Sequence, residues 1–209
     1  FREIGAQGLE LENKVVEIAR KFKMRLIGPN CVGVMDLYSG VNTTFIKGTP
    51  PKGKIGFLSQ SGAICGAVVD YVLDKDIGFS NFTSMGNMAD VDETDIIEYL
   101  STDPNTKVIA AYLEGIKDGR RLMEVARKVS RIKPIVILKV GRSEAGARAV
   151  SSHTGSLAGS HAAYQAAFEQ TGIIEVGSAA ELFDVCIGLV YQPAPRGPQT
   201  AVKIGRAHV

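Results

Sequence analysis

The sequence lacks the features that mark several protein classes. Among its 209 residues there are only three cysteines, Cys31, Cys65 and Cys186, whose odd number and wide spacing argue against a disulfide framework and suit a reducing cytoplasm. No apolar run approaches the roughly 20 residues of a membrane-spanning helix, and the first residues lack a signal-peptide core. A net charge of +2 gives no sign of the strongly basic surface that binds nucleic acid or an anionic membrane. We expect a cytoplasmic protein without membrane or nucleic-acid partners.

What remains is the composition of a globular protein, 45% hydrophobic and 22% charged, with a length that allows one or two domains. The chain begins at Phe1 rather than Met, and KIGRAHV interrupts a new strand-like run, GPQTAV. Because IGRAHV matches a translated sequencing adapter, we set aside roughly the last seven residues, including His208. We expect a piece of a longer protein.

The first 52 residues divide into a structured part and a linker. Leu11, Val15, Ile18, Ala19 and Phe22 share one helical stripe and predict a helix over 9–22, followed by a short strand, RLIG. Gly, Pro, Thr and Asn then accumulate without any period, which predicts a linker over 41–52. We expect one domain to end at residue 40, a second to span 53–192, and 193–209 to hold the start of a third domain and the adapter tail.

Strand-like and helix-like runs alternate through the second domain. The strand-like runs are KIGFLS, FSNFTS, KVIAAYLE, PIVILKV and IIEV, and the helix-like segments are 62–74, 92–101, 118–131, 156–171 and 179–190. This alternation predicts an α/β fold, a flavodoxin-like doubly wound parallel sheet with helices on both faces. Such sheets bind ligands at the carboxyl ends of their strands, so the strand-to-helix turns are the candidate sites.

The turn after KIGFLS holds Ser61, Gly62 and Ala63 at the start of a helix. Small residues allow a ligand to approach the backbone, and the free amides of a helix start attract an anion. The plainer interpretation, a serine that only caps the helix, stays open.

The second candidate turn, SSHTGSLAGS, places His153 among small polar residues ahead of another helix. A neutral imidazole can accept a phosphoryl group, and a helix start near Gly155 and Ser156 would offset the added charge. The alternative is an exposed loop histidine. His161 and the scattered cysteines do not give zinc-ligand spacing, so we expect no metal site.

Two acidic turns complete the set of candidates. Glu114 ends the strand KVIAAYLE and could fix the tautomer of a catalytic imidazole, or it could simply be the acid that precedes the next helix. Asp92, in the loop GNMADVD, is expected to cap a helix rather than to take part in catalysis.

Together these segments resemble the NDP-forming acyl-CoA synthetases, in particular the ADP-forming acetate–CoA ligase type, relatives of the succinyl-CoA synthetase alpha subunit. The resemblance is carried, in family order, by IGPNCVG (27–33), GKIGFLSQSGA (53–63), GNMADVDETD (86–95), YLEGIKDGR (112–120) and SSHTGSLAGS (151–160).

The resemblance implies an enzyme that interconverts acyl-CoA, ADP and phosphate with a carboxylic acid, CoA and ATP, through an acyl phosphate and a phosphohistidine. By it, His153 carries the phosphoryl group, Glu114 orients it, and Ser61, Gly62, Ala63, Gly155 and Ser156 bind phosphate. Residues 1–40 would end a Rossmann-like CoA-binding domain, with Pro29, Asn30 and Cys31 near the CoA thiol. ADP or ATP with Mg²⁺ would bind mainly to an ATP-grasp domain or subunit, in an oligomer, and this piece would be inactive alone.

Two other functions stay open. A degenerate synthetase region in a protein lysine acyltransferase would sense acyl-CoA, although such copies tend to lose the histidine that is present here as His153. A plain flavodoxin-like domain would bind flavin or nucleotide and would not be phosphorylated.

Overall fold

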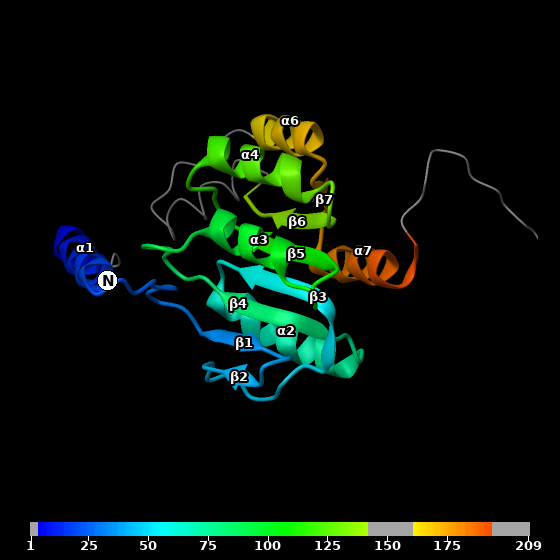
Figure 1. Ribbon diagram of the computed structural model, residues 1–209, viewed down its shortest axis with the longest axis horizontal. Helices are drawn as coiled ribbons and strands as arrows, with labels where there is room; N and C mark the ends of the chain where they lie inside the picture. The colour runs from blue at the N-terminus through cyan, green and yellow to red at the C-terminus, as the bar shows by residue number, and fades with distance from the viewer. Residues whose placement is uncertain (1–3, 142–160, 194–209) are drawn as a thin grey trace, which may run out of the picture.

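The computed structural model describes residues 4–141 and 161–193, which are built around one seven-stranded sheet (Figure 1). The strand order is β2-β1-β4-β3-β5-β6-β7. The parallel strands are β3 (Lys52–Ser59), β4 (Phe79–Ser84), β5 (Val108–Leu113), β6 (Ile135–Lys139) and β7 (Ile174–Glu175). Since β4 and β5 flank β3, with β6 and β7 beyond β5, this is the flavodoxin-like order, and the expected fold class is confirmed.

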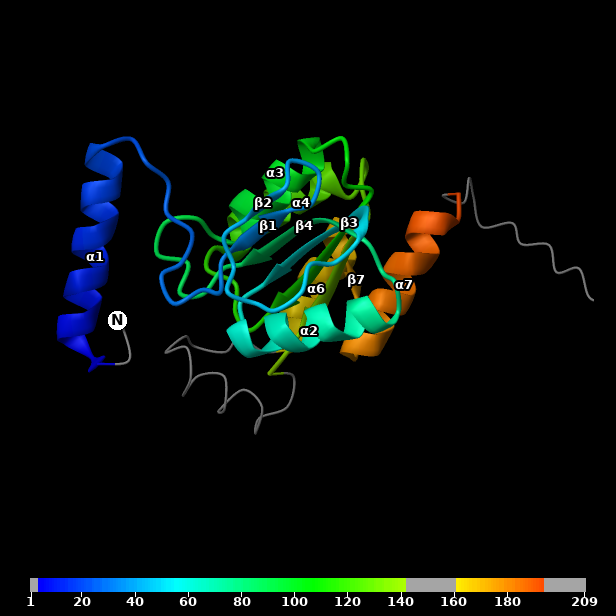
Figure 2. The same ribbon diagram turned by 90° about the horizontal axis from the view of Figure 1, so that it is seen from below.

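Helices cover both faces of the sheet (Figures 1 and 2). One layer packs α2 (Gly62–Asp74) and α7 (Ala179–Tyr191), and the other packs α3 (Glu93–Thr102), α4 (Gly119–Val129) and α6 (His161–Thr171). Successive strand residues face opposite sides, so the fully buried Phe57 and Leu58 belong to the two different core clusters. None of the helices in the described ranges is long and apolar enough to cross a membrane.

The segment before β3 departs from the sequence-based expectations. The strand expected at RLIG is wrong, because residues 25–28 form no strand and hydrogen-bond instead to the loop after β4. Two short strands that were not expected, β1 (Val34–Asp36) and β2 (Val41–Asn42), add to β4 as an antiparallel edge. Part of the segment predicted as a linker thus lies in the sheet, while the division into domains stays a prediction.

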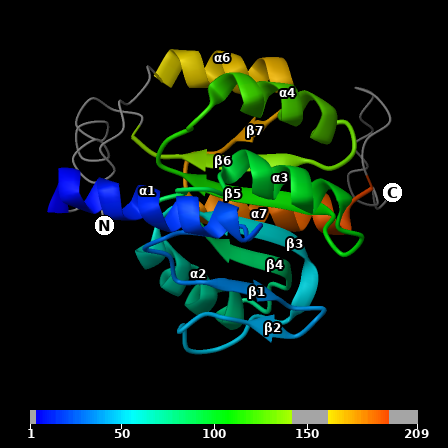
Figure 3. The same cartoon turned by 60° about the vertical axis from the view of Figure 1, so that its left-hand side comes forward.

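The first helix, α1 (Ala6–Lys21), lies at one end of the molecule in Figure 1 and crosses in front of the sheet in Figure 3. It is the helix expected over 9–22, but its apolar stripe is largely exposed: Leu11, Ile18 and Phe22 are 46%, 56% and 64% accessible. The face that contacts the rest of the chain carries Glu12, whose Oε2 accepts a 2.8 Å hydrogen bond from Asn87 Nδ2.

Gly86 allows the loop after β4 to lie against the segment that follows α1. Its φ of +55° is in the left-handed region, and a Cβ there would stand 2.3 Å from the carbonyl oxygen of Pro29. The neighbouring amides donate to the same segment, Asn87 N to Pro29 O at 2.9 Å and Ala89 N to Gly28 O at 2.8 Å. Both the backbone angle and the close approach therefore require glycine at this position.

We predict that Gly86→Ala destabilises the protein by more than roughly 2 kcal/mol, because the left-handed angle alone costs about 1–2 kcal/mol and the new methyl group overlaps Pro29. Urea unfolding measures the change. The control is Gly66→Ala in α2, where a Cβ meets nothing within 4 Å and a gain of about 0.5–1 kcal/mol is expected. Equal effects of the two substitutions would contradict this role of Gly86.

Candidate functional site

The turns that follow β3 and β5 lie side by side at the carboxyl edge of the sheet. The two strands are paired in parallel up to Ser59 opposite Tyr112, and the next ladder bond runs from Gln60 N to Tyr112 O at 3.1 Å. Ser61, two residues after β3, and Glu114, the first residue after β5, are therefore held at the same edge. The turns that hold these two candidates thus lie at one edge of the sheet, although 53 positions separate Ser61 from Glu114 in the numbering.

Ser61 is the N-cap of α2, and its Oγ accepts a 3.5 Å hydrogen bond from Ile64 N. Ser59 Oγ supports the turn because it accepts from Ser61 N at 3.1 Å and donates to Ser61 O at 3.0 Å. The capping role weighed from the sequence is thus present. Gly62 and Ala63 occupy the first turn of the helix, where backbone amides have no intrahelical acceptor and carry partial positive charge.

Gln60 is a residue of this edge that sequence reasoning missed. Its side chain is 9% exposed and bonds to the backbone of Glu114 and Gly115 on the neighbouring strand end. Lys139 was missed as well: it is 3% exposed at the end of β6, and its Nζ donates to Glu114 O at 2.8 Å. A lysine that ends the otherwise apolar run IVILK was the available signal, since lysine is rarely buried without a partner.

The segment Pro29–Cys31 lies against the loop after β4. Asn30 is exposed, with a φ of +56°, and its Nδ2 donates to Asn87 Oδ1 at 3.5 Å. Cys31 is half-buried and is a free thiol. Val32 N donates to Ser84 Oγ at 3.0 Å, which fixes this segment beside the tip of β4.

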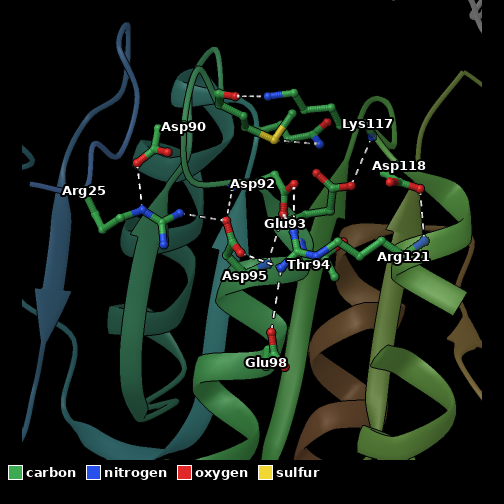
Figure 4. A network of polar contacts seen from close by, with 12 residues as sticks. Arg25, Asp90, Asp92, Glu93, Thr94, Asp95, Glu98, Lys117, Asp118 and Arg121 are labelled. Atoms are coloured by element: carbon green, nitrogen blue, oxygen red, sulfur yellow. Dashed lines mark hydrogen bonds and ion pairs between the residues drawn. The ribbon is translucent and has the colours of Figure 1, made fainter. Parts of the chain in front are cut away.

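An ion-pair network holds the acidic loop in place (Figure 4). Asp92 caps α3 in a capping box with Asp95, as expected, and Arg121 of α4 donates to both carboxylates. Arg25 bonds to Asp90 at 2.8 Å and to Asp95 at 3.2 Å. Although burial acts in the opposite direction, the hydrogen bond from Arg25 lowers the pKa of Asp90. The network therefore ties the segment after α1 to α3 and α4.

Glu93 is a fully buried carboxyl at the start of α3, in the centre of Figure 4. Its Oε1 accepts from Lys117 N at 3.1 Å, whereas its Oε2 has no hydrogen-bond partner within the described ranges. Burial raises the pKa of Glu93 to about 6, against the opposing effect of the Lys117 hydrogen bond.

The remaining candidates, His153, Gly155 and Ser156, lie outside the described residues. His161, at the start of α6, has its Nδ1 3.9 Å from Glu175 Oε1. Within residues 4–141 and 161–193, no group of three or more His, Cys, Asp or Glu side chains is placed to hold a metal ion.

Comparison with known proteins assigns the chain to a family. The succinyl-CoA ligase like flavodoxin domain matches residues 52–189, from the first residue of β3 to the last turn of α7. The chain belongs to this family. Its flavodoxin-like sheet, derived above from the strand order, is the fold that the family description names.

Relatives of this flavodoxin-like domain are longer proteins. The ADP-forming acetate–CoA ligase I of Archaeoglobus fulgidus is 49% identical over 190 residues, which is 91% of this chain and 28% of that protein. The alpha subunit of the Pyrococcus furiosus ADP-forming acetate–CoA ligase II is 48% identical over 202 residues, 97% of this chain and 44% of the subunit. This chain spans less than half the length of either.

A similar structure has also been solved for Ca. Korarchaeum cryptofilum. Its dinucleotide-forming acetyl-coenzyme A synthetase 1, in complex with phosphate and ADP, superposes with a TM-score of 0.89 at 43% identity, covering 94% of this chain and 42% of that one. The likeness therefore extends from the sequence to the fold.

The buried carboxyl of Glu93 generates a prediction about pH. Because the folded state retains this proton at pH values where the unfolded chain has lost it, the free energy of unfolding should fall as pH rises from about 4.5 to about 6. The shift corresponds to a fall of roughly 2 kcal/mol at about 1.4 kcal/mol per pKa unit.

Urea unfolding of the wild type and of Glu93→Gln across this pH range tests the prediction. The glutamine variant should lack the fall, and parallel curves for the two proteins would show that Glu93 is not its source.

Proposed function

We propose that the parent protein is an NDP-forming acid–CoA ligase. It interconverts acyl-CoA, ADP and phosphate with a carboxylic acid, CoA and ATP. The observation that supports this most strongly is the 49% identity with an ADP-forming acetate–CoA ligase over 91% of this chain. The fold adds a second support, since the turns of Ser61 and Glu114 meet at the edge of the sheet where doubly wound folds bind ligands.

The proposed chemistry has three steps. Inorganic phosphate attacks the thioester carbonyl of acyl-CoA, so the carbon–sulfur bond breaks and acyl phosphate and CoA form. An imidazole nitrogen of His153 then attacks phosphorus, and the carboxylic acid leaves as its carboxylate. The phosphohistidine finally transfers its phosphoryl group to ADP, which yields ATP and restores the imidazole.

The chain's own residues have distinct parts in this scheme. Glu114 accepts the N–H of the His153 imidazole, which fixes the tautomer and leaves the other nitrogen free to attack. The first-turn amides at Gly62 and Ala63 stabilise the transferred phosphoryl group, and an exposed helix start contributes about 0.3–1 kcal/mol to such an anion. Gly155 and Ser156 would supply the second helix start. Pro29, Asn30 and Cys31 would lie near the CoA thiol.

The nucleotide is proposed to bind, with Mg²⁺, mainly outside this chain, on an ATP-grasp domain or subunit within an oligomer. The Archaeoglobus fulgidus relative, 49% identical, is a protein of which this chain covers 28%. The Pyrococcus furiosus relative, 48% identical, is an alpha subunit of which it covers 44%. The region thus occurs both in a longer chain and in a separate subunit, which is consistent with a nucleotide-binding part attached in either way. The residues ahead of the linker would end the CoA-binding domain.

Phosphorylation of the intact parent protein tests the proposal. Incubation with radiolabelled ATP and magnesium should place an acid-labile, alkali-stable label on the protein, and His153→Ala should abolish it. Undiminished label in that variant would refute the assignment of His153.

The role of Glu114 gives a separate prediction. Glu114→Gln should lower the initial rate of labelling on the order of a hundredfold, because a positioned acid–base partner typically contributes about 10²–10⁴ in rate. The thermal unfolding midpoint should stay that of the wild type, since the half-buried carboxylate is not part of the core. A wild-type labelling rate would remove Glu114 from the mechanism.

A further inference from the structure

Among residues 4–141 and 161–193, the backbone ladder bonds stop just before Glu114 on both sides of β5. Toward β3 the last is Gln60 N to Tyr112 O at 3.1 Å, and toward β6 the last is Val140 N to Leu113 O at 3.0 Å. A parallel sheet orders its strands only as far as this ladder continues. Glu114 and Gly115 lie beyond it, and side chains from the two neighbouring strand ends take over their hydrogen bonds.

Gln60 supplies most of these bonds from the β3 side. Its Oε1 accepts from Glu114 N at 2.6 Å and from Gly115 N at 2.9 Å, and its Nε2 donates to Gly115 O at 2.6 Å. A longer bond from Nε2 reaches Met88 Sδ at 3.4 Å. The amide thus uses two acceptor and two donor positions. This fixes its orientation, because turning the amide over would place its NH2 group against the backbone N–H groups of Glu114 and Gly115.

Lys139 supplies the remaining bond from the β6 side. Its Nζ donates to Glu114 O at 2.8 Å and to Val140 O at 2.6 Å, and it lies 4.6 Å from the ring centroid of Tyr164 on α6. Burying an ammonium group costs free energy unless it is well coordinated, and the carbonyl oxygen of Glu114 is one of the groups that coordinate this one.

We propose that Gln60 and Lys139 are positioning residues that clamp the backbone of Glu114 from both adjacent strand ends and thereby aim its carboxylate at the imidazole of His153. This inference rests on the proposed function. With the amide and carbonyl groups of Glu114 both bonded, the direction of its Cα–Cβ bond is fixed and only the side-chain torsions remain free. The pKa of Tyr112, two positions before Glu114, is raised first by burial and then by the charge of Glu114.

Replacing each clamp residue by methionine removes its hydrogen bonds at similar side-chain length. At saturating ATP in the intact parent protein, Gln60→Met and Lys139→Met should each lower the rate of His153 labelling roughly ten- to hundredfold, since a displacement of about 1 Å can cost a hundredfold. The KM for nucleotide should not change. Gln60 is neutral and Lys139 is charged, so similar losses in the two variants identify positioning as the shared cause.

The same substitutions in a Glu114→Gln background separate positioning from a general structural role. If the clamp acts through the carboxylate, replacing Gln60 or Lys139 should lower the labelling rate by less than about threefold once Glu114 is already glutamine. A full loss in both backgrounds, or wild-type rates in the single variants, would overturn the clamp. If Gln60→Met does not fold, Gln60→Leu, which also removes every side-chain hydrogen bond to Glu114 and Gly115, gives the same comparison.

Matched controls use exposed residues of the same type. Gln165→Met on α6 and Lys128→Met on α4 should leave the labelling rate unchanged.

His153→Ala distinguishes the two proposals: label that persists in this variant refutes the proposed function. Label that disappears in it, together with wild-type rates for Gln60→Met and Lys139→Met, refutes only the clamp.

Discussion

The hydrogen bonds from Gln60 to the backbone of Glu114 and Gly115 tie together the ends of two adjacent strands, and the candidate site depends on that tie. On one side of Gln60 is Ser61, which starts α2, and across the bonds is Glu114. Parallel pairing brings strand ends to a common edge, but it leaves the turns beyond the last ladder bond to be ordered by other groups. Here a buried glutamine and a buried lysine provide that order, so an anion-attracting helix start and a carboxylate are held in a fixed relation.

The loop after β4 performs a corresponding task for the segment that holds Pro29, Asn30 and Cys31. Gly86 allows the two backbones to approach, and the carboxylate of Asp90 accepts from Leu26 N at 3.0 Å as well as from Arg25. Charge and backbone bonds thus join this segment to the sheet domain without a strand. In the proposed enzyme, this junction would keep the CoA-proximal residues close to the phosphoryl site while the two parts remain separate elements of the fold.

The sequence predicted the parts of the structure that depend on local periodicity. The alternation of apolar strands and helices predicted the flavodoxin-like order, and the turns after β3 and β5 followed from their strands. The edge strands β1 and β2 were not predicted because they are too short to show alternation. RLIG was wrongly predicted as a strand because its hydrogen-bond partners belong to a loop. Neither Gln60 nor Lys139 could be assigned a partner, since contacts between residues 54 and 25 positions apart leave no local pattern. Whether the apolar stripe of α1 is buried depends on what packs against that helix. The sequence alone therefore could not predict that the stripe would be exposed.

The turns after β3 and β5 are proposed to form one anion site. A crystal structure of the intact parent protein phosphorylated on His153 would test it most directly. We expect the phosphoryl group within hydrogen-bonding distance of the amides at the start of α2, with the Glu114 carboxylate bonded to the imidazole and Gln60 still bonded to the Glu114 backbone. A phosphoryl group bound at another edge of the sheet, with Glu114 facing away from the imidazole, would contradict it.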